Sequence, residues 1–255
     1  MALTCLPVNT PVHSTSANQP IKAEEADWYN EFYRSIQTEL PPWYRAMIPD
    51  LDRELSPQRT LLELGCGQGH VLRLLAKEGK LPPENIWGID QSQTAVELVK
   101  QHLPSAHVEA GDIYGLNLPR QHFDVCLLME TIEHLEQPAP ALRNIFEVLA
   151  PGGALYLSFP NYLHFPWLLV RILAEKLNRP NWIVLQPIDK VYTVFTVKRL
   201  LREAGFSFER GMGSNFGPPV FYRWERPWMT RFGNALGLWW LSFHPVLKFR
   251  KPAGK

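Results

Sequence analysis

The segment Leu61–His70, LLELGCGQGH, places glycines at every second position: Gly65, Gly67 and Gly69. An apolar run precedes these glycines, and the helical pattern VLRLLAKEGK follows them. The order predicts a buried strand that turns tightly into a helix and brings bare backbone close to a ligand. Several nucleotide-containing cofactors bind at such a turn, so the ligand has to be identified from the spacing and from neighbouring motifs.

Strand and helix patterns alternate along the chain after this turn. Continuously apolar strands are expected at 60–66, 85–90, 107–112, 123–130 and 154–161, and the helices between them at 71–80, 94–103 and 139–150. A further helix at 196–206, with Gly205 as its cap, leads to a sixth strand at 206–212. An amphipathic helix at 24–40 precedes the first strand. Apolar strands that alternate with helices indicate a doubly wound α/β domain with a parallel sheet covered on both faces.

Composition narrows the class of protein. The 255 residues are 45% hydrophobic and carry a net charge of +1, which suits one domain with a full core and gives no chain-wide attraction to nucleic acid. Cys5, Cys66 and Cys126 have no metal-binding or disulfide spacing and fit a reducing cytoplasm. The longest apolar run, 235–243, is far shorter than the roughly 20 residues of a membrane-spanning helix.

The glycine spacing distinguishes between cofactors. The sequence has GxGxG rather than the GxGxxG that seats a pyrophosphate on a helix N-terminus. S-adenosylmethionine (SAM) has no pyrophosphate and needs room for its methionine moiety, whose amino group Glu63 could meet. Asp90 ends the second predicted strand, where a carboxylate can accept both ribose hydroxyls of NAD or of SAM. Asp112 and Ile113 follow the third strand, where they could contact an adenine.

These motifs, together with FDxxxxxExxEHL at 123–135 and LAPGG at 149–153, resemble the class I SAM-dependent methyltransferases, most closely the type 11 group. The resemblance covers roughly residues 57–210 and implies a Rossmann-like, mostly parallel sheet of seven strands. It implies SAM as cofactor and these cofactor-binding residues: Glu63, Gly65, Cys66, Gly67, Gly69, Asp90, Gln91, Asp112, Ile113 and Glu130. Each motif alone also fits a structural role, as a tight turn at the glycines, a helix N-cap at Asp90 or a loop cap at Asp112.

His134 is the candidate catalytic residue. Its imidazole is expected at the carboxyl edge of the sheet, where it could act as a base toward an oxygen nucleophile or could instead fix the loop by hydrogen bonding. Glu130, Glu133 and His134 would share one face of a helix, and ExxEH resembles a metal-binding motif of ubiquinone-pathway O-methyltransferases and small-RNA 2′-O-methyltransferases. Lys190 stands where the RNA group has a further histidine, and we assign no metal ligand here.

The chain divides into a disordered leader at 1–22, a methyltransferase domain at 23–222 with a cap at 161–195, and a C-terminal tail at 223–255. The aromatic residues of the cap favour a small aromatic or lipid-like acceptor: Tyr162, His164, Phe165, Trp167, Trp182, Tyr192 and Phe195. Basic residues of the tail outnumber Glu225 by seven to one, a net charge of +6: Arg223, Arg226, Arg231, Lys248, Arg250, Lys251 and Lys255.

The tail also interleaves its basic residues with aromatics: Trp224, Trp228, Phe232, Trp239, Trp240, Phe243 and Phe249. This pattern predicts a peripheral membrane contact of a cytoplasmic protein, whereas the alternative is that the tail packs on the sheet or on a second copy. The sequence as a whole predicts methyl transfer from SAM to an oxygen atom, with nitrogen or carbon less favoured as the acceptor atom. A non-catalytic SAM-binding scaffold, an RNA 2′-O-methyltransferase and a nicotinamide oxidoreductase are the alternatives, with nucleic acid the less favoured partner.

Overall fold

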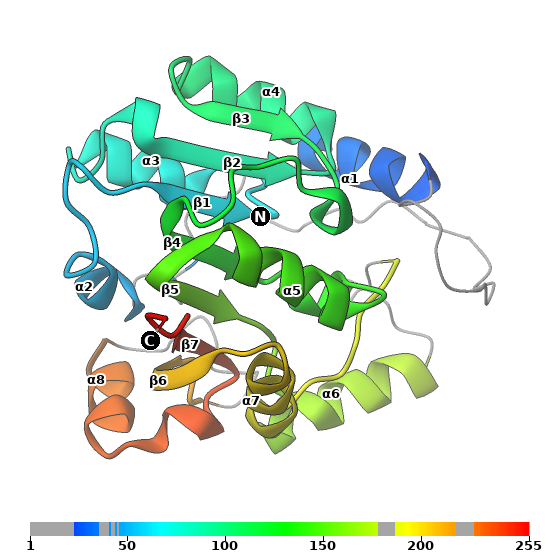
Figure 1. Ribbon diagram of the computed structural model, residues 1–255. Helices are drawn as coiled ribbons and strands as arrows, with labels where there is room; N and C mark the ends of the chain where they lie inside the picture. Colours follow the sequence, from blue (N-terminus) through cyan, green and yellow to red (C-terminus); the bar gives the residue numbers. More distant parts are fainter. Residues whose placement is uncertain are drawn as a thin grey trace.

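The computed structural model describes residues 23–35, 41, 44, 46–177, 187–217 and 227–254. Its strands form a mixed sheet in the order β3-β2-β1-β4-β5-β7-β6 (Figure 1). The strands are β1 (Leu61–Leu64), β2 (Ile86–Asp90), β3 (His107–Ala110), β4 (Phe123–Met129), β5 (Leu149–Ser158), β6 (Ser207–Ser214) and β7 (His244–Arg250). Neighbours among β1 to β5 pair in parallel, and β7 is antiparallel to β5 and β6. The predicted fold class is confirmed.

Helices cover both faces of this sheet. They are α1 (Ala23–Ser35), α2 (Ile48–Leu51), α3 (His70–Lys77), α4 (Gln93–His102), α5 (Pro138–Val148), α6 (Phe165–Lys176), α7 (Val194–Glu203) and α8 (Pro227–Ala235). Figure 1 shows α5 and α7 in front of the sheet and α3 behind it. The helix expected at 24–40 is seen as α1, and residues 36–40 and the predicted leader lie outside the described residues.

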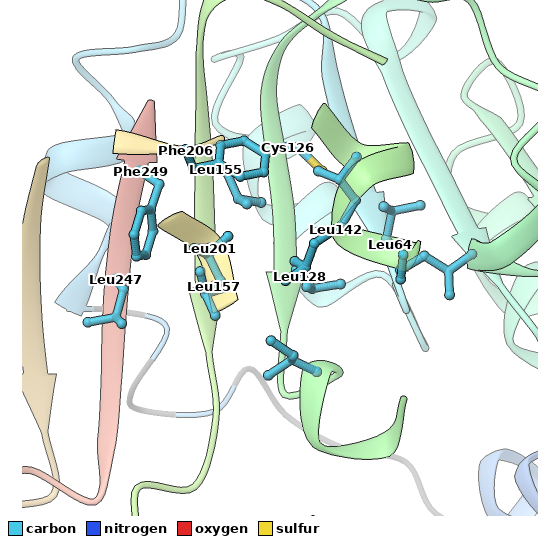
Figure 2. Close-up of a cluster of buried hydrophobic side chains, with 14 of the residues drawn as sticks. Leu64, Cys126, Leu128, Leu142, Leu155, Leu157, Leu201, Phe206, Leu247 and Phe249 are labelled. Carbon is cyan, nitrogen blue, oxygen red and sulfur yellow. The ribbon is translucent and has the colours of Figure 1, made fainter. Parts of the chain in front are cut away.

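Two apolar clusters separate the helices from the sheet. On one face, Leu142 of α5 and Leu201 of α7 pack with strand residues such as Leu128 and Leu157 (Figure 2). On the other face, Leu72 of α3 and side chains of α4 pack against β1, β2 and β4. Because the central strands are buried on both sides, their apolar runs are continuous rather than alternating. This packing fixes where the carboxyl ends of the strands lie.

The seventh strand comes from the segment that the sequence assigned to a tail. β7 lies between β5 and β6, with Phe249 1% exposed and Phe243 just before the strand 7% exposed. The division at residue 222 therefore needs correction, since residues 244–250 belong to the sheet. The sequence pattern did not reveal β7 because charged residues interrupt its apolar positions, and the partners of these charged residues lie elsewhere in the chain.

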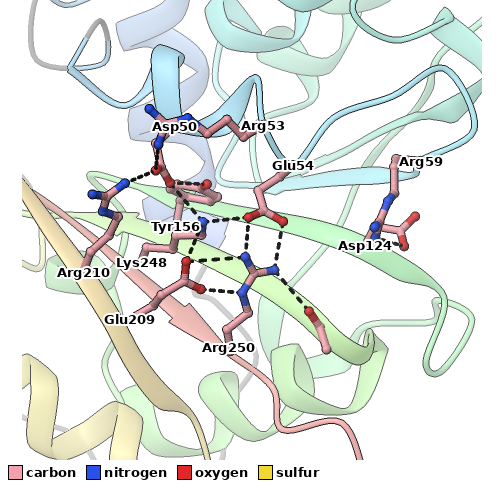
Figure 3. Close-up of polar contacts among 11 residues, drawn as sticks. Asp50, Arg53, Glu54, Arg59, Asp124, Tyr156, Glu209, Arg210, Lys248 and Arg250 are labelled. Carbon is pink, nitrogen blue, oxygen red and sulfur yellow. Dashed lines mark hydrogen bonds and ion pairs between the residues drawn. The ribbon is translucent and has the colours of Figure 1, made fainter.

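Buried charges attach β7 to the segment after α2 (Figure 3). The Lys248 side chain is 3% exposed, and its Nζ lies within 3.0 Å of three carboxylates: Asp50, Glu54 and Glu209. Arg250 pairs with both Glu54 and Glu209. Burial alone would raise the pKa of Asp50 and Glu54, but hydrogen bonds outweigh it and lower the pKa of both, from Tyr156 and basic side chains at Asp50 and from basic side chains at Glu54. A cation buried here is stable only because it is paired.

We expect Lys248→Met to destabilise the protein by about 3 kcal/mol, because it leaves three carboxylates facing one another without their shared cation. The matched control is Arg59→Gln, which breaks an ion pair with Asp124 whose side chains are 48% and 25% exposed. That change should cost less than about 1 kcal/mol. Urea unfolding of the two variants measures both, and equal losses would contradict this assignment.

Candidate functional site

The glycine turn adopts a backbone that other residues rarely tolerate. Gly65, Gly67 and Gly69 have φ of +70°, +49° and +65° as the chain passes from β1 into α3. A Cβ on Gly65 would lie 2.4 Å from Oγ1 of Thr131, which follows β4. A left-handed φ and this close approach together exclude a side chain at Gly65. The turn expected from the sequence is therefore present, at the carboxyl end of β1.

Asp90 connects this turn to the second strand. Its Oδ2 accepts a hydrogen bond from the Gly67 backbone N–H at 2.8 Å, and its Oδ1 accepts from the Ser92 N–H at 2.9 Å. Asp90 is 5% exposed, and burial raises the pKa of its carboxyl group although both hydrogen bonds oppose the shift. The N-cap of α4 is Ser92, whose Oγ accepts from the Ala95 N–H. Asp90 is thus not the helix cap, and each of its oxygens retains a lone pair for a hydroxyl.

Glu63 is a buried carboxyl group with a free oxygen. It is 3% exposed on β1, and its Oε2 has no hydrogen-bond partner in the described part of the chain. Burial, with the nearby charge of Asp90, raises the pKa of Glu63 to about 8. A cationic group bound here would satisfy the oxygen and favour the ionised form. The ammonium group of a methionine moiety has this chemistry, so the residues present fit SAM.

The remaining predicted cofactor residues lie along the same edge. Gly111 N–H donates to the Asp90 carbonyl at 2.9 Å, which places Asp112 and Ile113 beside the end of β2. Asp112 Oδ1 caps the following turn by accepting from the Tyr114 N–H, so its expected structural role is present and Oδ2 is left for a ligand. Ile113 is buried. Gln91 is half-buried directly after Asp90, and Cys66 is a buried free thiol whose pKa burial raises.

The sequence missed a contribution from α1. A Cβ on Gly67 would lie 2.8 Å from the Tyr33 hydroxyl, so α1 packs against the glycine turn. Asn30 Oδ1 accepts from Ser92 Oγ at 2.7 Å and from the Thr94 N–H at 3.2 Å, joining α1 to the start of α4. The sequence shows polar residues at helical spacing next to the apolar face of this helix. Nothing in the sequence, however, indicates that the helix packs over the glycine turn.

The ExxEH segment is not one helix. Glu130 has φ of +48° directly after β4, and the short 3-10 helix Ile132–His134 follows. Glu130 Oε2 faces Nε2 of His244, from β7, at 3.7 Å. Within the described ranges, no group of three His, Cys, Asp or Glu side chains is arranged to hold a metal ion. The face that Glu130, Glu133 and His134 would share on one helix is therefore not formed.

Glu133 is buried and the Glu130 side chain is 20% exposed, and each has one buried oxygen, Glu130 Oε1 and Glu133 Oε2, without a hydrogen-bond partner among the described residues. Burial raises the pKa of Glu130 to about 7. Burial and the charge of Glu130 raise the pKa of Glu133 well above its usual range. The two carboxyl groups after β4 can thus accept a proton only in their ionised forms. A bound ligand, a neighbouring base or a higher pH would favour those forms.

His134 contacts the cap. Its Nδ1 lies 2.6 Å from the Ile188 carbonyl oxygen, and because a carbonyl only accepts, Nδ1 carries the proton in the neutral ring. Its Nε2 then holds the lone pair, 3.6 Å from Glu133 Oε1 and beyond hydrogen-bond distance. Burial lowers the pKa of His134, opposed by the hydrogen bond to Ile188. The loop-fixing role expected for His134 is seen, and its Nε2 is still able to accept a proton.

One buried cation organises the described part of the cap. Arg171 of α6, 8% exposed, donates to the Tyr162 hydroxyl at 2.9 Å and to Asp189 Oδ2 at 3.0 Å. The predicted cap residues Tyr162, His164 and Tyr192 are buried, whereas Phe165 and Phe195 are 67% and 63% exposed. Trp167 is half-buried against Phe243, and Trp182 lies outside the described residues. The cap aromatics therefore do not form one surface.

The strand order, the antiparallel β7 and the glycine turn at the end of β1 define the class I methyltransferase fold. A possible histamine N-methyltransferase from Thermotoga maritima shares it, with a TM-score of 0.59 and 19% identity over 89% of this chain and 95% of that one. At that identity the likeness concerns the fold alone.

Sequence comparison identifies the domain. Residues 62–157 match the family described as a methyltransferase domain, type 11. A probable S-adenosylmethionine-dependent methyltransferase of Mycolicibacterium smegmatis is 33% identical over 107 residues, 42% of this chain and 40% of that protein. The ubiquinone biosynthesis O-methyltransferase of Coxiella burnetii is 30% identical over 119 residues, 45% of this chain and 49% of that protein.

The chain thus spans less than half the length of either relative. Residues 62–157 form a methyltransferase domain of the SAM-dependent class I type, and this family and fold imply SAM as the cofactor. The resemblance seen in the sequence is confirmed.

We expect Gly65→Ala to weaken binding of S-adenosylhomocysteine by at least about tenfold, because its Cβ displaces Thr131 and opens the turn. The matched control is Gly79→Ala, where φ is also positive at +65° but a Cβ would meet nothing within 4 Å. Backbone strain is common to both variants, so calorimetric titration isolates the effect of the contact. Unchanged affinity in a folded Gly65→Ala protein would show that the turn does not shape the cofactor site.

Proposed function

We propose that the protein transfers a methyl group from SAM to an oxygen nucleophile of a small aromatic or lipid-like acceptor. SAM supplies a methyl group that is already activated. The chain would hold the methionine end at Glu63 and the ribose at Asp90, keep water out and accept the proton of the acceptor hydroxyl. A non-catalytic SAM-binding scaffold and an RNA 2′-O-methyltransferase remain the alternatives.

The protonation state of the His134 imidazole is the observation that carries this proposal. Its Nδ1 hydrogen bond to the Ile188 carbonyl leaves Nε2 as the proton acceptor at the carboxyl end of β4. The lowered pKa keeps the imidazole neutral at pH 7. A hydroxyl acceptor benefits from such a base, whereas a neutral amine or thiolate can attack without one.

The kind of acceptor is inferred from the cap and from the relatives. The cap segment of the sequence is rich in aromatic residues, a composition that favours a flat or apolar acceptor. The name of the Coxiella burnetii relative describes O-methylation in ubiquinone biosynthesis, which concerns an aromatic and prenylated compound. Both observations support a phenolic acceptor.

The test is transfer of a labelled methyl group from SAM to small molecules of a cell extract. A catalyst labels a compound that can be extracted, and a scaffold labels nothing. Labelled RNA in place of a small molecule would favour the 2′-O-methyltransferase alternative. An extract digested with ribonuclease before the assay separates these two outcomes.

His134→Ala should reduce turnover by about 100-fold or more while binding of S-adenosylhomocysteine stays unchanged, because only the proton acceptor is lost. His134→Asn is the matched control, since its amide can still donate to the Ile188 carbonyl. A residue that only fixes the loop would be rescued by Asn, whereas a base would not. Full activity in His134→Asn would remove His134 from the proton transfer.

The pH dependence gives the second readout. Because the pKa of His134 is lowered from 6.5, its base form is retained at pH 7 and activity should fall only below about pH 6.5. A decline centred near pH 7 would instead indicate Glu130, whose pKa is about 7. The profile of kcat/KM reports these groups in the free enzyme.

Chelation tests the metal hypothesis. Because Glu130 and the Ile132–His134 turn do not form one helical face, we expect activity to survive exhaustive treatment with EDTA. A loss that Mg²⁺ or Zn²⁺ restores would show that these side chains converge on a metal when the acceptor is bound. The control is S-adenosylhomocysteine binding after the same treatment, which should be unaffected in either case.

A further inference from the structure

One face of α8 is apolar and exposed. Trp228, Phe232 and Leu236 follow one another at a spacing of four residues, and their side chains are 65%, 60% and 56% exposed. The Leu236 N–H donates to the Phe232 carbonyl, so the helical spacing continues to Leu236. Large apolar side chains are singly exposed on many proteins, but a row of three along a helix is typical of an interaction surface.

The opposite face of α8 is fixed to the sheet. Asn234 Oδ1 accepts from the Gly213 N–H at 2.7 Å, and Asn234 Nδ2 donates to the Gly213 carbonyl at 2.8 Å. A Cβ on Gly233 would lie 2.6 Å from the Phe216 ring, so the helix approaches its neighbours as closely as a glycine permits. Rotating α8 to bury its apolar row would break both hydrogen bonds of Asn234 to β6. The row is therefore directed outward by the fold itself.

The charge of neighbouring residues indicates which kind of partner covers the apolar face of α8. Arg231 lies on α8 between the apolar residues and is exposed, and Arg223 and Arg226 precede the helix in the sequence. After Glu225 the printed sequence contains no acidic residue. By contrast, Lys248 and Arg250 are occupied by the ion pairs of β7. Arg231 thus places a positive charge on α8 beside the exposed apolar row.

We propose that the row Trp228, Phe232 and Leu236 docks on the surface of an anionic lipid bilayer, with Arg231 at the headgroups. An interfacial helix inserts its apolar side chains at the boundary of the acyl chains, and tryptophan prefers that depth. Basic residues such as Arg231 add electrostatic attraction at an anionic surface. No helix in the described part of the chain is long and apolar enough to cross a bilayer, so this contact is peripheral. It requires no methyl transfer and is independent of the proposed function.

The experiment is flotation of the full-length protein with vesicles of phosphatidylcholine, with and without phosphatidylglycerol. We expect binding to the anionic vesicles that weakens as salt is raised. Trp228→Ser with Phe232→Ser should reduce the partition coefficient by at least about 100-fold, because each buried aromatic contributes at least about a factor of ten, or 1.4 kcal/mol. Arg231→Gln should weaken binding less and reduce its dependence on salt.

Controls separate the surface from the fold. The pair Gln101→Glu and Ser105→Glu adds two charges at exposed positions in and after α4, which lies at the opposite end of the molecule from α8 in Figure 1, and should bind almost as the unaltered protein does. Thermal unfolding of every variant shows whether the sheet is intact. Absence of binding to either vesicle, or equal binding by the serine variant, would overturn the proposal. A dimer of the unaltered protein that the serine variant dissociates would also overturn it and assign the face to a second copy.

Discussion

The site depends on the Asp90 carboxylate, which holds the glycine turn against the second strand. One oxygen accepts from Gly67 and the other from Ser92, so a single side chain sets both the turn after β1 and the start of α4. The turn needs this support because its three glycines are held in left-handed backbone conformations. Glycine loses more conformational entropy than other residues when folding fixes its backbone. Asn30 of α1 reaches the same Ser92, which brings the N-terminal helix to the site.

A second constraint acts at the other side of the sheet. Lys248 and its carboxylates connect β7, the last strand in sequence, to the segment that follows α2. His244 at the start of the same strand faces Glu130 after β4. The insertion of β7 between β5 and β6 therefore determines both the stability of the sheet edge and the surroundings of the carboxyl groups beside the cofactor edge.

The sequence predicted the parts of the molecule that depend on local pattern. Continuous apolar runs identified the central strands, and the glycine spacing identified the turn and the cofactor, because both follow from backbone geometry close to the residues concerned. β7 was missed because Lys248 and Arg250 interrupt its pattern, and their partners Glu54 and Glu209 are distant in sequence. The positions of Tyr33 and Asn30 over the turn also depend on long-range packing. Glu130 was expected at the end of a strand, and its positive φ has no signal in a sequence without a glycine there.

The central claim is that this turn binds SAM rather than a dinucleotide. The most direct measurement is thermal unfolding of the full chain with S-adenosylhomocysteine and, separately, with NAD. A ligand at 100 times its dissociation constant stabilises the native state by about 2.7 kcal/mol, which for a chain of this size raises Tm by roughly 5 °C. The account predicts this increase with S-adenosylhomocysteine and none with NAD. An increase with NAD alone would contradict it.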